Sequence, residues 1–150
     1  MNYDMVISIL VIPDDDPGVV TALHRATHAT LHALGARLAY LALTASEHNV
    51  LAVLAEGRSR AVGELAMATG TRPTTLTSVL DRLAGRQLLT RELDPADRRS
   101  FLIELTPAGR RTASTVRAAV TELEQHALSS LTPAQIAGFH AVTRALTEVH

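Results

Sequence analysis

Apolar positions between residues 73 and 84 repeat with the period of a helix. Leu76, Val79, Leu80 and Leu83 fall at the i, i+3, i+4, i+7 spacing of one helix face. The opposite face is short and mostly hydroxylated, with Thr74, Thr77, Ser78 and Asp81. A helix with such an outer face suits docking into a groove.

Two short apolar runs follow this helix, LLTREL at 88–93 and SFLIEL at 100–105. The charged turn sequence DPADRR joins them, which is typical of a two-stranded hairpin. Before the helix, residues 58–70 form a shorter apolar pattern that ends at Gly70, and the break TGTR separates the two. We interpret the pair as a helix-turn-helix whose second member is the recognition helix, and the hairpin as its wing.

Long amphipathic helices are predicted on both sides of this unit. The first covers residues 17–42, with Asp16 as N-cap and Pro17 at the first helical position. Two more begin after the N-cap candidates Thr106 and Thr132. Their apolar stripes are larger than the small central unit can cover, so we expect the two chain ends to form a homodimer.

A further helix opens at Thr44, where Thr44 and Glu47 have the spacing of a capping box. The predicted fold class is therefore mostly α, an α+β winged helix-turn-helix with long terminal helices, in one compact domain. Residues 1–43 and 107–150 are assigned to a helical dimerisation region, and residues 44–106 to the DNA-binding region.

Composition and charge agree with this hypothesis. The chain has 150 residues, 47% of them hydrophobic and 19% charged, which is typical of one ordered domain. It has no cysteine, which excludes disulfides and thiolate metal sites. Overall net charge is −1, but residues 58–111 hold ten arginines against six acids, +4, on the segment expected to meet phosphates.

The apolar stretch at residues 5–12 is too short to span a membrane and lacks the basic start of a signal peptide. We therefore expect a cytoplasmic protein with no membrane partner.

The order of these motifs resembles the MarR family of bacterial transcription regulators. Three ordered motifs carry the resemblance from Leu43 to Arg110: LTASEHNVLAVL, VGELAMATGTRPTTLTSVLDRLAGRQLL and DPADRRSFLIELTPAGR. The resemblance implies a homodimer that places two winged lobes on adjacent major grooves of a pseudo-palindromic double-stranded DNA operator. It also implies a regulator that is usually a repressor and is often released by a small molecule. We expect no cofactor.

The resemblance also implies a set of DNA-binding residues. In the wing, the carboxylate of Asp97 would orient Arg99 into the minor groove, and Arg98 would lie beside it on the backbone. The family usually has glycine where this chain has Gln87, so we expect the recognition helix to fray or end near Ala84. The residues expected to contact base edges or phosphates from the recognition helix are Arg72, Thr74, Thr75, Thr77, Ser78 and Arg82.

The histidines allow alternatives. His24, His28 and His32 lie at i, i+4, i+8, and a Glu-His pair at Glu47 and His48 is found in zinc-responsive members of the family. The other histidines of those members have no counterpart here, so we expect no metal site. His32 and His48 are instead candidates for hydrogen bonding in an organic-ligand pocket.

The sequence argues against two other classes of protein. The chain has no nucleophile elbow, phosphate-binding glycine loop or HExxH motif, so we do not expect an enzyme. A winged helix used for protein interaction is the other alternative, but it would more often expose apolar residues where this recognition helix has hydroxyls.

Overall fold

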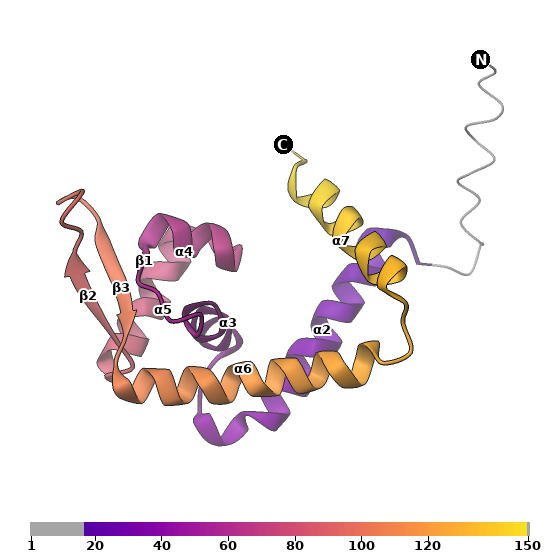
Figure 1. Cartoon of the computed structure of the whole chain (residues 1–150), viewed down its shortest axis with the longest axis horizontal. Coiled ribbons are helices and arrows are strands. Elements are labelled where there is room, and N and C mark those ends of the chain that lie inside the picture. The colour runs from indigo at the N-terminus through magenta and orange to yellow at the C-terminus, as the bar shows by residue number, and fades with distance from the viewer. Residues whose placement is uncertain (1–16, 150) are drawn as a thin grey trace, which may run out of the picture.

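The computed structural model describes residues 17–149 (Figure 1). This part of the chain has six α-helices, one 3-10 turn and a small sheet that lies at one end of the molecule. The helices are α2 (Val19–Arg37), α3 (Ala45–Leu54), α4 (Val62–Thr69), α5 (Pro73–Gly85), α6 (Pro107–Leu128) and α7 (Pro133–Thr147). The predicted N-cap Asp16 lies outside the described residues.

The sheet has three antiparallel strands in the order β1-β3-β2. Strands β2 (Leu89–Leu93) and β3 (Phe101–Leu105) form the predicted wing, with Leu89 opposite Leu105. Strand β1 (Arg60–Ala61), which pairs with β3, was not predicted. A two-residue strand is too short to show the alternation by which strands are recognised.

The mostly helical winged helix-turn-helix predicted from the sequence is confirmed. Thr44 caps α3, with its hydroxyl accepting from the Glu47 N–H and the Glu47 carboxylate accepting from the Thr44 N–H. Thr106 and Thr132 cap α6 and α7 at the predicted positions. These starts were predictable because each cap depends on residues three positions apart.

The prediction that the first helix continues to residue 42 is wrong. Helix α2 begins after Gly18 and ends at Arg37, and Ala39–Leu41 form the 3-10 turn η1. Ala42 then adopts a left-handed conformation with φ of 49°. The carbonyl oxygens of Leu41 and Ala42 accept hydrogen bonds from the Arg86 guanidinium. A side chain distant in sequence therefore stabilises the end of η1.

Most of the hydrophobic core lies inside the winged-helix lobe, which we define as α3 to β3 together with the first half of α6. Leu38, between α2 and η1, also belongs to the core. Helices α2 and α7 have no buried residue. In Figure 1 they stand together at the opposite end of α6 from the wing. The largest fully buried side chains are Leu38, Val50, Leu51, Leu54, Leu65, Leu76, Val79, Leu80, Leu83, Ile103 and Val116.

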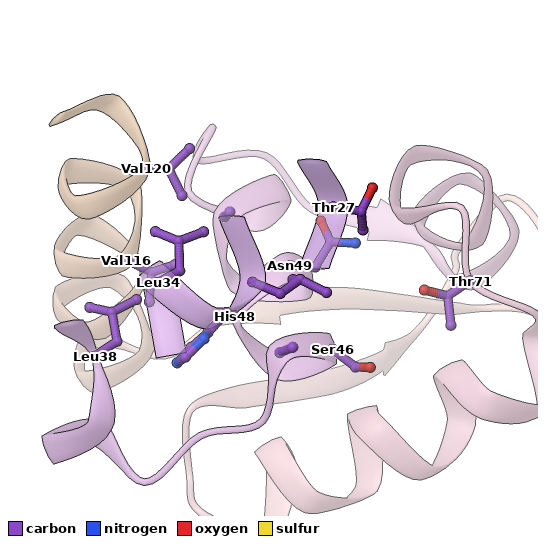
Figure 2. Close-up of a pocket in the computed structure, with 12 residues that line it drawn as sticks. Thr27, Leu34, Leu38, Ser46, His48, Asn49, Thr71, Val116 and Val120 are labelled. Atoms are coloured by element: carbon purple, nitrogen blue, oxygen red, sulfur yellow. The ribbon is translucent and has the colours of Figure 1, made fainter. Parts of the chain in front are cut away.

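A cavity of about 480 Å³ lies where α2, α3 and α6 meet (Figure 2). It adjoins the core of the winged-helix lobe, because Leu38 and Val116 belong to both.

Candidate nucleic-acid interface and ligand cavity

Helix α5 has one buried face and one polar exposed face. Pro73 occupies its first turn, where a missing N–H costs nothing. Its four apolar side chains are all at most 1% exposed, so the orientation of the helix about its axis is fixed. This orientation leaves the predicted DNA-contact residues of the helix exposed: Arg72, Thr74, Thr75, Thr77, Ser78 and Arg82.

Two of the exposed hydroxyls donate to the backbone of their own helix. Thr77 Oγ1 donates to the carbonyl of Pro73 at 3.0 Å, and Ser78 Oγ donates to that of Thr75 at 2.8 Å. Each oxygen keeps lone pairs that can accept from a base amino group, and each hydroxyl can rotate to donate elsewhere.

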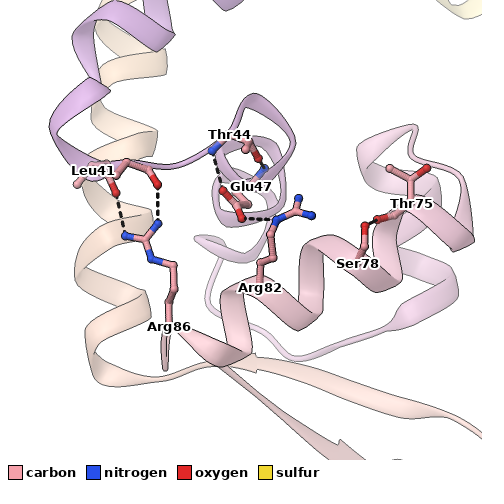
Figure 3. A network of polar contacts seen from close by, with 8 residues as sticks. Leu41, Thr44, Glu47, Thr75, Ser78, Arg82 and Arg86 are labelled. Carbon is pink, nitrogen blue, oxygen red and sulfur yellow. Dashed lines mark hydrogen bonds and ion pairs between the residues drawn. The ribbon is translucent and has the colours of Figure 1, made fainter.

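Arg82 has an intramolecular partner that the sequence did not reveal. Its Nε donates to Glu47 Oε1 at 2.9 Å, across the interface of α5 with α3 (Figure 3). The Glu47 side chain is only 4% exposed, whereas that of Arg82 is half exposed. Burial raises the pKa of Glu47, but hydrogen bonds from the Thr44 N–H, the Arg82 guanidinium and the Thr44 hydroxyl outweigh it and lower the pKa overall.

Arg86 is a second arginine that links α5 to a distant segment, and sequence reasoning missed it. Its two terminal nitrogens donate to the carbonyls of Ala42 and Leu41, both at 2.8 Å (Figure 3). Its partners are backbone atoms more than forty residues away, so no local signal points to them. The recognition helix is therefore tied at Arg82 and Arg86 to the start of α3 and the end of η1.

The recognition helix ends at Gly85, one residue beyond the predicted Ala84. Gln87 takes the left-handed conformation that glycine would normally supply, with φ of 58°. The Gln87 N–H donates to Ala84 and the Leu88 N–H donates to Leu83, which together form a Schellman motif. Leu83 and Leu88 are both buried, and this apolar contact stabilises the ending without glycine.

The turn of the wing is stabilised by two aspartates. Asp94 accepts from the Ala96 N–H, and Asp97 accepts from the Arg99 N–H at 3.0 Å. The expected contact between the Asp97 carboxylate and the Arg99 guanidinium is absent from the ion pairs of residues 17–149, so Asp97 orients the backbone of Arg99 instead. Arg98 and Arg99 are exposed.

The wing and the recognition helix share one groove. Arg99 and Thr77 both line it, together with Val62, Leu80, Arg91, Ser100 and Phe101. The Arg91 guanidinium also donates a hydrogen bond to Asp81 Oδ1 at 2.6 Å, and this ion pair joins β2 to α5. The fold thus brings the predicted contact residues Thr77 and Arg99 together from segments 22 positions apart.

The cavity beside α3 contains one of the two histidines proposed for ligand binding. His48 lines it, with its ring on the same side as Leu38 in Figure 2, whereas His32 is an exposed residue of α2 outside the cavity lining. Burial lowers the pKa of His48, and the nearby Glu47 carboxylate offsets this in part. No cluster of three potential metal ligands occurs among residues 17–149, and His24, His28 and His32 are all exposed.

No helix in the described part of the chain is long and apolar enough to cross a membrane.

Comparisons with known proteins identify the fold. The sequence has no significant match among curated proteins. The MarR family model matches residues 43–101. The structure of the Bordetella bronchiseptica regulator BpsR, whose DNA binding is regulated by 6-hydroxynicotinic acid, is similar with a TM-score of 0.74 at 27% identity, over 88% of this chain and 94% of that one.

Two further solved structures are similar over most of their length. CouR from Rhodococcus jostii RHA1, bound to p-coumaroyl-CoA, has a TM-score of 0.77 at 24% identity, over 89% of this chain and 94% of that one. Apo MarR from E. coli has a TM-score of 0.69 at 22% identity, over 88% of this chain and 98% of that one. The family match thus covers the winged helix, and these solved structures share the fold over most of the chain.

Proposed function

We propose that the protein is a homodimeric transcription regulator that binds a pseudo-palindromic double-stranded DNA operator. The observation that supports this most directly is the exposed face of α5. It combines four hydroxylated side chains with an arginine before the helix, and it shares a groove with Arg99 of the wing.

This face matches the chemistry of a major groove. Thr74, Thr75, Thr77 and Ser78 are short donors and acceptors that approach base edges closely. Arg72 at the start of α5 is suited to a phosphate, because a helix N-terminus also favours anions. On the wing, Arg98 and Arg99 would meet the flanking minor groove, where negative potential is concentrated.

Arg82 has a second role besides any contact with DNA. Because its Nε is bound to Glu47, the residue positions α5 against α3. The guanidinium is half exposed, and a phosphate contact through its terminal nitrogens is compatible with that pair.

The dimer would be formed by the chain ends. Val20 and Leu31 on α2, and Phe139 and Val142 on α7, are between 42% and 55% exposed in the single chain. Exposed apolar side chains grouped on helices that have no fully buried residue indicate an interface. We propose residues 1–43 and 107–150 as the dimerisation region and 44–106 as the DNA-binding region, with the first turns of α6 packed into the latter's core.

Repression released by a small molecule is the mode of action that we infer. The cavity between α2, α3 and α6 lies between the proposed dimerisation region and the DNA-binding region. A ligand held there would change their relative position, and with it the distance between the two recognition helices. Regulation of BpsR by 6-hydroxynicotinic acid and the p-coumaroyl-CoA bound to CouR support an effector for this chain.

Selection of bound fragments from random DNA tests the proposal. We expect an enriched sequence with two inverted half-sites about one helical turn apart, and a complex of two protomers per fragment by light scattering. Failure to enrich any sequence at low salt would refute DNA recognition. Enrichment of a single half-site by a monomer would refute the dimer alone.

A further inference from the structure

One arginine joins the recognition helix to the segment that leaves α2. Arg86 is the C-cap residue of α5, and its two terminal nitrogens donate to the carbonyls of Leu41 and Ala42, both at 2.8 Å (Figure 3). Among the described residues, these two bonds, which we name the Arg86 link, are the only side-chain hydrogen bonds between residues 17–43 and residues 44–106. The link therefore crosses from the proposed dimerisation region to the proposed DNA-binding region.

The backbone is unusual at both ends of the Arg86 link. Ala42 and Gln87 are the two non-glycine residues of 17–149 that have a positive φ. Such a conformation is unfavourable for a side chain and persists only where the surrounding structure holds it. The Arg86 N–H also donates to the Arg82 carbonyl, whereas no backbone N–H of residues 17–149 donates to the carbonyls of Leu41 and Ala42. The guanidinium thus supplies the protein donor that these two carbonyls otherwise lack.

The Arg86 link fixes an angle as well as a distance. A guanidinium is planar, so two bonds from one group to consecutive carbonyls hold α5 in one orientation. The other contacts across this boundary are apolar, from Leu34, Leu38 and Leu41 against the core, and apolar packing is not directional. Arg82 cannot fix this angle, because its partner Glu47 belongs to the DNA-binding region itself.

Helix α5 converts a small change of this angle into a displacement at the DNA. The predicted base contacts lie in its first two turns, and about 16 Å of helix separate Thr75 from Arg86. One base pair corresponds to about 3.4 Å along the DNA axis. A displacement of about half that distance in each of two protomers would therefore change the spacing at which both helices meet their bases.

We propose that Arg86 is a positioning residue that fixes the tilt of α5 and so sets the spacing between half-sites that the dimer accepts. This inference rests on the proposed function, because it concerns recognition of one operator by two linked lobes. Arg86 needs no contact with DNA for this role. It lies at the opposite end of α5 from the predicted base contacts, and both of its terminal nitrogens are bonded within the protein.

A panel of DNA fragments tests this role in the full chain. It contains the selected operator, the same half-sites one base pair closer or farther apart, and a single half-site. Loss of an exposed hydrogen-bonded contact changes an equilibrium by about two- to fivefold in each protomer. We therefore expect Arg86→Gln to reduce the preference for the selected spacing by about fivefold or more, while affinity for the single half-site stays unchanged. An unchanged spacing preference overturns the proposal.

A matched control separates position from charge. Arg58 is an exposed arginine of the same region that has no ion-pair partner within residues 17–149. Arg58→Gln removes the same charge and should leave the spacing preference as in wild type. If Arg86→Gln instead weakens binding equally at every spacing and lowers the slope of log affinity against log salt concentration by about one unit, Arg86 contacts a phosphate and the proposal is wrong.

Arg86→Lys tests the planar geometry. Lysine keeps the positive charge but lacks the planar fork that bonds two carbonyls at once. We expect this variant to keep the salt dependence of wild type and to lose most of the spacing preference. Full retention of the spacing preference would contradict the geometric argument.

Distances between spin labels test the tilt of α5 without DNA. The chain has no cysteine, so introduced cysteines are the only labelling sites. Ala36→Cys on α2 and Thr75→Cys on α5 place labels at exposed positions on either side of the Arg86 link. Dilution with unlabelled wild-type chain leaves mainly distances within one protomer. We expect a narrow distribution when Arg86 is present and a broader or shifted one in Arg86→Gln, and identical distributions overturn the proposal.

The two measurements distinguish failure of this inference from failure of the proposed function. If wild type selects no operator, the proposed function fails, and the spin-label distances still decide whether Arg86 fixes α5. If an operator is found but Arg86→Gln keeps its spacing preference, the positioning role fails alone.

Discussion

Gly109 in the first turn of α6 gives the sharpest structural prediction. A Cβ atom built on this residue would lie 1.7 Å from the carbonyl oxygen of Leu88. Ordinary contact requires roughly twice that distance, so the backbone must move by more than 1 Å in Gly109→Ala. The same carbonyl accepts from the Thr106 N–H at 3.1 Å, and the Thr106 hydroxyl accepts from the Gly109 N–H at 2.9 Å.

The expected loss of stability follows from these contacts. Separating the two backbones breaks one hydrogen bond of a partly buried carbonyl, about 1–3 kcal/mol, and disturbs an N-cap, about 1 kcal/mol. Alanine regains about 0.5–1 kcal/mol because it restricts the unfolded chain and favours helix. We expect a net loss of about 2–3 kcal/mol, which lowers Tm by roughly 5–12 °C in a protein of this size.

Thermal unfolding at one fixed protein concentration measures this loss, because Tm of a dimer depends on concentration. Gly63→Ala in α4 is the matched control, since nothing lies within 4 Å of its Cβ position and it is outside the proposed dimer interface. We expect the control to have an unchanged or slightly higher Tm. A Gly109→Ala protein as stable as wild type would refute the close approach of α6 to Leu88.

Four further predictions concern DNA binding, assembly and pH. Arg99→Ala should weaken operator binding by about one to a few kcal/mol in fluorescence anisotropy. It should also reduce the slope of log affinity against log salt concentration by about one unit. Unchanged affinity at equal salt would show that Arg99 is not in the interface. A bulky side chain in place of Thr77 should change the sequence recovered by selection as well as the affinity, and an unchanged sequence would argue against a base contact. Removal of residues 133–150 should give insoluble or monomeric protein by light scattering, and a stable dimer would contradict the proposed interface. The free energy of unfolding should fall in two steps as pH is lowered, because the folded pKa values of His48 and Glu47 are both depressed. The first step begins below about 6.5, where His48 takes up a proton in the unfolded chain. The second begins below about 4.5, where Glu47 does the same. Urea unfolding at constant ionic strength measures this, and a maximum of stability at pH 5 would contradict it.

The wing arginine has a suitable control on another surface. Arg144 lies in the last turn of α7, away from the wing and the recognition helix. Arg144→Ala removes the same charge and should leave the salt slope unchanged. Equal losses in both variants would show that net charge, and not the position of Arg99, determines affinity.

The parts of the fold that could be predicted are those determined by neighbouring residues. Capping pairs such as Thr44 with Glu47 lie three positions apart, and the buried face of α5 repeats with a period that the sequence displays. The end of the first helix, which was predicted wrongly, lies beside a segment held by a distant partner. Arg86 donates to the carbonyls of Leu41 and Ala42 at the end of η1, which follows α2.

The same distinction applies to the site. Exposure of the hydroxyls of α5 follows from helical periodicity, whereas the pairing of Arg82 with Glu47 depends on how two helices pack. His32 and His48 looked equivalent as residue types, but only His48 is on a helix face that meets α2 and α6. Tertiary packing therefore decides which of the two histidines lines the cavity.

Because most of the core lies within the winged-helix lobe and α2 and α7 have no fully buried residue in the single chain, folding and assembly depend largely on different residues. In the proposed dimer, dilution would separate the protomers while each lobe keeps its core. A single lobe covers one half-site and loses the affinity gained from two linked contacts. Below the dissociation constant of the dimer, operator occupancy would then rise with the square of protomer concentration, so modest changes in expression level would act as a steep genetic threshold.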